Sequence, residues 1–157
     1  MAPPLLVDLS TIDLNKVLFD TNEIERVNPH RAGMRMLDAI VYLNEADRSF
    51  VAYKDVRNDE FWVPGHIPGR PIFPGVLMIE AAAQLAGFMM KKFLNVSGFI
   101  GFAAVDGVKF RGQVVPGDRF YIMGKVNDLR PRRSICAMQG VVNGNLVFEG
   151  TVTGMPI

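Results

Sequence analysis

Residues 64–94 read PGHIPGRPIFPGVLMIEAAAQLAGFMMKKFL and contain the clearest helical segment of this sequence. Four of the chain's ten prolines fall in the first part of this stretch, a density that excludes a regular helix or a central strand there. From Val76 to about Leu94 the residues are apolar almost all round, and Lys91 and Lys92 stand in the last turn, where the helix dipole favours cations. Because a helix that is apolar on nearly every side has to be enclosed, we predict that this segment is the central helix of the fold.

Extended segments flank this helix in the sequence. Alternation and apolar content predict strands at Met34–Leu43, Arg48–Val56, Ala104–Val115, Arg119–Leu129, Ser134–Val142 and Leu146–Thr153. Pro116-Gly117-Asp118 supplies one turn, and Asn143-Gly144 is a strong signal for a two-residue hairpin. Two strands, one long helix and then a three- or four-stranded antiparallel meander predict an α+β domain. Its curved antiparallel sheet would wrap around the helix, which is the arrangement called a hot-dog fold.

The first 28 residues are predicted to form an extension with one short helix. Asp20 or Thr21 can cap the segment TNEIERV, and Glu23 is placed to complement the helix N-terminus. Asn28-Pro29 then ends the helix. Since no internal repeat, low-complexity stretch or linker divides the chain, residues 1–157 are predicted to form a single domain.

Composition excludes several classes of protein. Lys and Arg number 17 and Asp and Glu 16, and the resulting net charge of +1 argues against a dedicated nucleic-acid binder. One cysteine, Cys136, rules out an internal disulfide and a cysteine-rich metal site. The opening MAPPLLVDLS does not read as a signal peptide, and Glu80, Gln84 and Gly87 interrupt the longest apolar stretch, so no membrane insertion is expected. These features predict a cytoplasmic protein.

Two side chains in residues 64–94 stand out chemically. His66 lies in a loop that prolines and glycines restrain, which suits an imidazole held in one orientation, although it can equally be an ordinary loop histidine. Glu80 lies in the second turn of an otherwise apolar helix, and burial favours the protonated form of a carboxyl group, as an acid catalyst needs. Gln84 falls on the same helix face and can hydrogen-bond Glu80 or a neighbouring strand. The alternative for Glu80 and Gln84 is a polar stripe that faces solvent or a subunit interface.

Gly75 is the third element of this candidate site. Backbone N–H groups in the first turn of a helix have no helical partner, so the Gly75 N–H can bind a thioester carbonyl as its oxygen gains enolate character, although a plain helix start would look the same. A base in a rigid loop, an acid on a buried helix and a carbonyl clamp together predict removal of a proton α to a carbonyl with loss of a β-hydroxyl group. This chemistry needs neither a cofactor nor a metal.

The sequence GHIPGRPIFPGVLMIEAAAQLAG resembles the signature of the β-hydroxyacyl-[acyl-carrier-protein] dehydratases of type II fatty-acid synthesis (FabZ-like), which are hot-dog proteins. The resemblance extends from Pro29-His30-Arg31 to about Gly150 and includes AAVDGVKFRGQVVPGD at 103–118. It implies that His66 is the catalytic histidine, Glu80 the catalytic carboxylate and Gln84 a supporting residue, while the Gly75 N–H binds the carbonyl. It also implies that the His and Glu of one site come from different subunits of a homodimer, and that dimers can assemble into hexamers as trimers of dimers.

The resemblance further implies an acyl carrier protein as partner and an apolar acyl tunnel between protomers. Residues placed to line such a tunnel are Phe73, Val76, Met78, Phe99 and Phe102. The related dehydratase–isomerases typically carry Asp in place of both Glu80 and Arg70, so these two residues favour a plain dehydratase, with Arg70 in a supporting role. Ile67 stands where the family usually has Phe, which leaves the acyl chain length open.

Other polar residues have less specific interpretations. His30 is predicted to be structural, and a lone Cys136 in an apolar strand is expected to be buried and inert. A set of basic residues can either be solvated or help to dock an acidic carrier protein: Lys91, Lys92, Lys109, Arg111, Arg130, Arg132 and Arg133. Two other functions remain open at this point: a hot-dog acyl thioesterase, and a non-catalytic module that binds acyl groups or acyl carrier protein.

Overall fold

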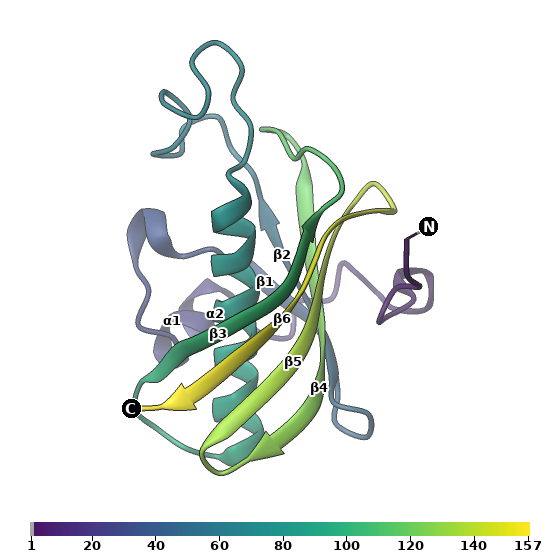
Figure 1. Cartoon of the computed structure of the whole chain (residues 1–157), viewed down its shortest axis with the longest axis vertical. Helices are drawn as coiled ribbons and strands as arrows, with labels where there is room; N and C mark the ends of the chain where they lie inside the picture. Colours follow the sequence, from purple (N-terminus) through teal and green to yellow (C-terminus); the bar gives the residue numbers. More distant parts are fainter. Residues whose placement is uncertain (1) are drawn as a thin grey trace.

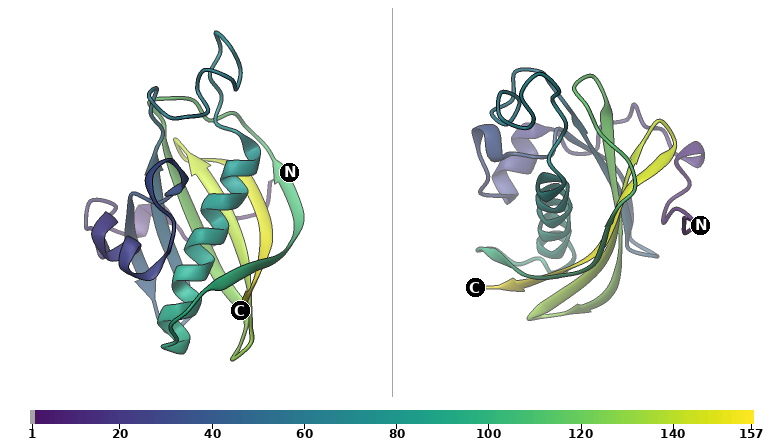
Figure 2. Two further views of the ribbon diagram at one scale, coloured as in Figure 1. Left: turned by 90° about the vertical axis from the view of Figure 1, so that its left-hand side faces the viewer. Right: turned by 45° about the horizontal axis from the view of Figure 1, so that its top comes forward.

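A computed structural model, which describes residues 2–157, contains one long helix and one six-stranded antiparallel sheet (Figure 1). The helices are η1 (Leu9–Thr11), α1 (Thr21–Val27), η2 (Ala32–Met34) and α2 (Gly75–Leu94). The strands are β1 (Ala39–Asn44), β2 (Ser49–Asp55), β3 (Ile100–Phe110), β4 (Arg119–Arg130), β5 (Arg133–Val142) and β6 (Asn145–Pro156). The sheet curves around α2, as the right-hand view of Figure 2 shows, which confirms the predicted hot-dog arrangement.

Helix α2 ends at Leu94, as the sequence predicts, and begins at Gly75, one residue before the predicted Val76. Pro74 is its N-cap residue, and Asn95 ends it in the left-handed conformation, with φ 50°. Its buried side chains join those of the concave sheet face in the main core, which includes Leu85, Phe88 and Phe148. One line of α2 stays open, however, because Val76 is 71% exposed and Ile79 is only partly buried. The sequence predicted that α2 is enclosed on most sides. Its core-facing residues are enclosed, but the side that carries Val76 and Ile79 is not.

The strand order is β1-β2-β4-β5-β6-β3, so the predicted meander has three strands and not four. Strands β4, β5 and β6 do form a meander, but β3 crosses to the far edge of the sheet and pairs with β6. The Asn143-Gly144 hairpin is confirmed, since both residues have positive φ and Val142 pairs directly with Asn145. Edge strand β3 therefore leaves one side of its backbone unpaired within residues 2–157.

The bounds of the first and third predicted strands differ most from the structure, and the last strand runs past its predicted end, Thr153, to Pro156. The first strand starts at Ala39 instead of Met34, because the 3-10 turn η2 and the chain after it run across α2, where Gln84 binds their backbone. The third strand is β3, so it starts before Ala104 and ends before Val115.

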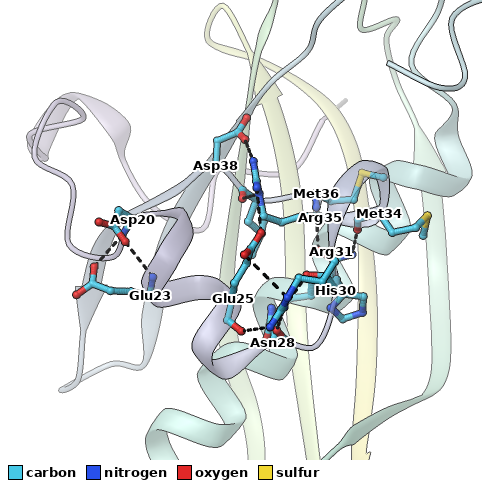
Figure 3. Close-up of polar contacts among 12 residues, drawn as sticks. Asp20, Glu23, Glu25, Asn28, His30, Arg31, Met34, Arg35, Met36 and Asp38 are labelled. Carbon is cyan, nitrogen blue, oxygen red and sulfur yellow. Dashed lines mark hydrogen bonds and ion pairs between the residues drawn. The ribbon is translucent and has the colours of Figure 1, made fainter. Parts of the chain in front are cut away.

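The N-terminal segment, here residues 4–14, covers the convex face of the sheet, opposite α2 (Figure 2). Its apolar side chains pack against a second cluster on that face, which includes Val41, Val51 and Met123. The amide of Gln139 on β5 accepts from Leu6 N at 2.8 Å and donates to Pro4 O at 3.0 Å. Further along, Asp20 and Glu23 form the capping box that starts α1, which confirms the predicted cap (Figure 3).

No helix among residues 2–157 is long and apolar enough to cross a membrane.

Candidate active site

A cavity of about 200 Å³ lies between α2 and the β3 side of the sheet. Residues from α2, β3, β5 and β6 line it together with the segment that follows α1; they include His30, Glu80, Gln84, Phe99, Phe102 and Ser134. Most of this lining is apolar, and three of its polar side chains, those of Glu80, Gln84 and His30, lie close together. An apolar cavity with a few convergent polar groups is the usual form of a small-molecule site.

Glu80 projects from the second turn of α2 with its side chain 25% exposed. Gln84 Nε2 donates to Glu80 Oε1 at 2.9 Å, and His30 Nε2 lies 3.4 Å from the same oxygen. Within residues 2–157, no hydrogen bond or ion pair reaches Glu80 Oε2. The two oxygens of this carboxyl group therefore differ: Oε1 accepts from Gln84 and lies close to His30, and Oε2 is free to interact with a bound molecule.

Gln84 is almost fully buried, and its amide orientation is fixed. Its Oε1 accepts from Met36 N at 2.9 Å, and its Nε2 donates to Met34 O at 2.7 Å as well as to Glu80. A flipped amide would set its N–H group against the Met36 N–H and its oxygen against the Met34 carbonyl, so only the observed orientation satisfies all partners. The sequence predicted a Glu80–Gln84 pair from their spacing, and the structure confirms that contact.

His30 lies beside Glu80 in the cavity, where the sequence indicated only a structural role. Burial lowers the pKa of His30 below its usual range, the positive charges of Lys91 and Arg31 act in the same direction, and Glu80 opposes them. His30 is therefore neutral near pH 7. Residues 30 and 80 are too far apart in the sequence for any local spacing rule to predict their contact. The Pro29-His30-Arg31 motif is the sequence feature that could have indicated a place for His30 in the site.

His66 lies in the long loop between β2 and α2, which projects beyond the N-terminal end of α2 (Figure 1). Its Nδ1 is 2.7 Å from Ile72 O, its backbone N–H donates to Trp62 O at 2.8 Å, and its carbonyl accepts from Ile72 N at 3.0 Å. A carbonyl oxygen only accepts, so Nδ1 carries the ring proton and Nε2 is left with its lone pair. The loop thus presents an oriented imidazole whose free nitrogen can act as a base.

His66 and Glu80 do not meet in one chain. No hydrogen bond or ion pair joins them within residues 2–157, and His66 is absent from the lining of the cavity that contains Glu80.

Gly75 is the first residue of α2, and its N–H belongs to the helical turn that has no partner within the helix. A Cβ at this position would lie 2.8 Å from the Phe110 ring of β3. Glycine is therefore what allows Phe110 to pack over the start of α2, directly beside the free N–H groups.

The other residues assigned to the site lie in three different environments. Phe99 and Phe102 line the cavity, and both are nearly half exposed. Phe73 and Met78 are instead buried in the core, with the Phe73 ring against Trp62 and Phe120, because Phe73 enters the sheet interior just before α2.

Val76 points away from the core of its own chain. Arg70 is exposed in the His66 loop, with Nη2 at 3.5 Å from Gln113 Oε1.

Several of the basic residues considered for carrier docking are engaged within the chain. Arg130 and Arg133 both pair with Asp128 and lower the pKa of its carboxyl group. Arg111 pairs with Glu149 at 2.7 Å.

Lys91 and Lys92 at the end of α2 also have partners. Lys91 Nζ donates to Val27 O at 2.6 Å, and Lys92 Nζ lies 4.7 Å from the centre of the Phe19 ring. Cys136 is buried as predicted, and burial raises the pKa of its thiol. Within the described part of the chain, no three His, Cys, Asp or Glu side chains are grouped so that they could hold a metal ion.

Residues 28–151 match the family described as FabA-like domain. The chain is 42% identical over 141 residues to the 3-hydroxyacyl-[acyl-carrier-protein] dehydratase FabZ of Teredinibacter turnerae, covering 86% of this chain and 94% of that protein. It is 36% identical over 137 residues to the enzyme of the same name from Streptococcus sanguinis, covering 87% and 96%. The fold is similar to the dehydratase heterocomplex ApeI:P of Xenorhabdus doucetiae, with TM-score 0.73, 16% identity and coverage of 85% and 90%. The chain therefore belongs to the FabA-like domain family.

Proposed function

We propose that this chain dehydrates (3R)-hydroxyacyl groups carried as thioesters on acyl carrier protein, giving the trans-2-enoyl thioester and water in fatty-acid biosynthesis. The names of its relatives support the substrate, and the observation that carries the proposal is a carboxyl group with one oxygen held and the other free beside an apolar cavity. The reaction is redox-neutral, and it needs one base, one acid and one group that binds the carbonyl oxygen.

His66 is the base in this proposal. Its Nδ1–H is held by Ile72 O, so Nε2 can accept the α-proton of the substrate. The Gly75 N–H donates to the thioester oxygen, which gains negative charge as the α-proton leaves. An α-proton is weakly acidic until its carbonyl is polarised, and the two groups therefore act together.

Glu80 is the acid. The electron pair of the broken Cα–H bond forms the Cα=Cβ double bond, the Cβ–O bond breaks, and the hydroxyl leaves as water with the proton from Glu80 Oε2. His66 then carries one extra proton and Glu80 lacks one, so return of that proton restores both groups. Oε2 is the oxygen that can carry the transferred proton, because Gln84 donates to Oε1.

The complete site requires a second copy of the chain. His66 and Glu80 are apart in one chain, whereas the unpaired edge β3 and the half-exposed Phe102 lie at the cavity that contains Glu80, and the exposed Val76 lies one turn before Glu80 on α2. Pairing of two β3 edges would cover this apolar surface and bring the His66 loop of one protomer toward Glu80 of the other. A homodimer with shared sites follows, and trimers of dimers remain an extension of the same proposal.

The remaining assignments form part of this proposal. Phe99 and Phe102 line the acyl tunnel from one protomer, and the exposed Val76 contributes from the dimer interface. Arg70 supports the His66 loop, and the acidic carrier protein docks at local basic groups, since the net charge is only +1. We also propose that the whole chain works as one domain, because the N-terminal segment packs on the same sheet. The proposed location is the cytoplasm.

Turnover of hydroxyacyl–carrier thioesters of several chain lengths tests the function, with enoyl absorbance and a thiol-trapping dye read in parallel. We expect enoyl formation without thiol release, and His66→Ala and Glu80→Gln should each lower kcat by about 10²-fold or more. Glu45→Gln, at an exposed carboxylate in the β1–β2 turn, is the matched control and should keep full activity. Thiol release without enoyl product would instead identify a thioesterase, and full activity of either site variant would refute the assignment.

A further inference from the structure

Two side-chain nitrogens lie close to the same oxygen of Glu80, one from Gln84 and one from His30. Gln84 donates from the next turn of α2, and His30 approaches from the segment after α1. The role proposed for Glu80 uses Gln84 and leaves His30 unexplained. A histidine in contact with the catalytic carboxyl group is well placed to act on the reaction through it.

The tautomer of His30 follows from its surroundings. Its Nδ1 is buried and has no hydrogen-bond partner among residues 2–157, while Nε2 faces the Glu80 carboxyl group. A proton on Nδ1 would bury an unpartnered donor and set the Nε2 lone pair against a carboxyl oxygen. A proton on Nε2 leaves Nδ1 as an unpartnered acceptor but removes the repulsion between the Nε2 lone pair and the carboxyl oxygen, so His30 presents an N–H group to Glu80 Oε1.

The backbone around His30 is fixed by hydrogen bonds (Figure 3). Asn28 Nδ2 donates to Gln84 O at 3.0 Å, which ties this segment to α2. Arg31 Nη1 donates to the carbonyls of Asn28 and His30, and its Nη2 donates to Glu25 O at 2.8 Å. A segment held at several points costs little further ordering when the imidazole engages Glu80, and its position relative to α2 is preset.

A neutral imidazole is the form of His30 that suits this contact, because burial lowers its pKa. The charged groups that act on it are Glu80 and Lys91 on α2 and Arg31 beside it, and the two cations also disfavour an imidazolium. The residues that line the cavity from β3, which are Ile100, Gly101 and Phe102, carry no charge. His30 therefore approaches Glu80 Oε1, at 3.4 Å, as a neutral donor and not as the cation of an ion pair.

We propose that His30 is a positioning residue for Glu80: together with Gln84 it fixes Oε1 by an Nε2–H donor and so directs Oε2, with its proton, at the leaving hydroxyl. This inference rests on the proposed dehydratase function. It assigns His30 no contact with the substrate. Its loss should therefore impair the chemical step more than binding, because a misdirected acid still leaves the acyl cavity intact.

Three substitutions at position 30 test whether His30 acts as a hydrogen-bond donor at Nε2 or has another role, such as packing. A glutamine side chain places its amide nitrogen near the position of the histidine Nε2, whereas an asparagine side chain reaches only the position of Nδ1. Phenylalanine keeps a ring of similar size with no donor. We expect His30→Phe and His30→Asn to lower kcat by about 10- to 100-fold with KM changed less than about threefold, while His30→Gln stays within about threefold of wild type.

The kinetic measurements use the full-length protein with hydroxyacyl–carrier substrate, and thermal unfolding is recorded for each variant. Equal activity of the Gln and Asn variants, wild-type activity of the Phe variant, or a change confined to KM would each overturn the role of His30. Loss of activity that follows the melting temperature across all three variants would also overturn it, because that result indicates packing alone. If the wild-type protein forms no enoyl product, the proposed function itself fails, which is a result distinct from any ranking of the variants.

Discussion

Replacement of Gln84 with methionine should destabilise the fold strongly, although the new side chain has nearly the same length and is apolar. Gln84 is only 2% exposed, and its amide makes hydrogen bonds with Met36 N, Met34 O and Glu80 Oε1. Methionine can replace the packing of the side chain but none of these bonds. The end of η2 and the segment before β1 would then lose these hydrogen bonds to α2.

The size of the effect follows from the groups left without partners. The Met36 N–H belongs to a fully buried residue, and an unsatisfied buried donor costs about 1–3 kcal/mol. Met34 is 44% exposed, so water can rehydrate its carbonyl at a smaller cost. We therefore expect a loss of about 2–4 kcal/mol in the free energy of unfolding, a sizeable part of the stability of a typical domain.

Urea unfolding measures this loss, with wild type and variant compared at one protein concentration because a dimer is expected. For a slope of about 2 kcal/mol per molar urea, the midpoint should fall by about 1–2 M. The matched control is Gln113→Met, because Gln113 is exposed and its contact with Arg70 is long, at 3.5 Å. We expect the control to stay within about 0.5 kcal/mol of wild type. A Gln84→Met protein as stable as that control would refute the reasoning from buried hydrogen bonds.

Three other outcomes follow from the structure. Gln139→Leu should release the N-terminal segment from the convex face, so protease should cleave the segment faster while the rest of the chain stays intact; unchanged cleavage would contradict this role of Gln139. The pKa of His30 is lowered by burial, so the unfolded chain binds more protons, and stability should fall as pH drops below about 6.5; His30→Gln should flatten this fall, and an identical pH profile would contradict it. Gly75→Ala should push the Phe110 ring away from the start of α2 and raise KM for acyl–carrier substrate, whereas an unchanged KM would show that this approach is unimportant.

Local patterns in the sequence were sufficient for several parts of the fold. Continuous apolar content and the flanking proline gave α2, and the requirement for two positive φ angles gave the hairpin at Asn143-Gly144. The pairing of β3 with β6 was not predictable, because strand partners far apart in the sequence are chosen by packing against α2 and not by local propensity. The covering of the convex face by the N-terminal segment has the same non-local origin.

The candidate site divides in a similar way. Glu80 and Gln84 lie one turn apart on a helix, so their contact follows from helical geometry. The approach of His30 to Glu80 depends on how the segment after α1 crosses α2, and no spacing rule describes that crossing. The separation of His66 from Glu80 within one chain depends on the path of a loop rich in prolines, which restrict its conformation without defining its direction.

Activity of mixed dimers tests most directly whether one site combines His66 of one chain with Glu80 of another. His66→Ala and Glu80→Gln chains are co-expressed with different tags, and the doubly tagged species is assayed for enoyl formation beside each variant alone. Every mixed dimer should hold one intact site of its two, so we expect about half of the wild-type rate in purified mixed dimers and about a quarter in an unsorted equal mixture. Mixed dimers that are as inactive as either parent, while wild type turns over, would contradict a site shared between two chains.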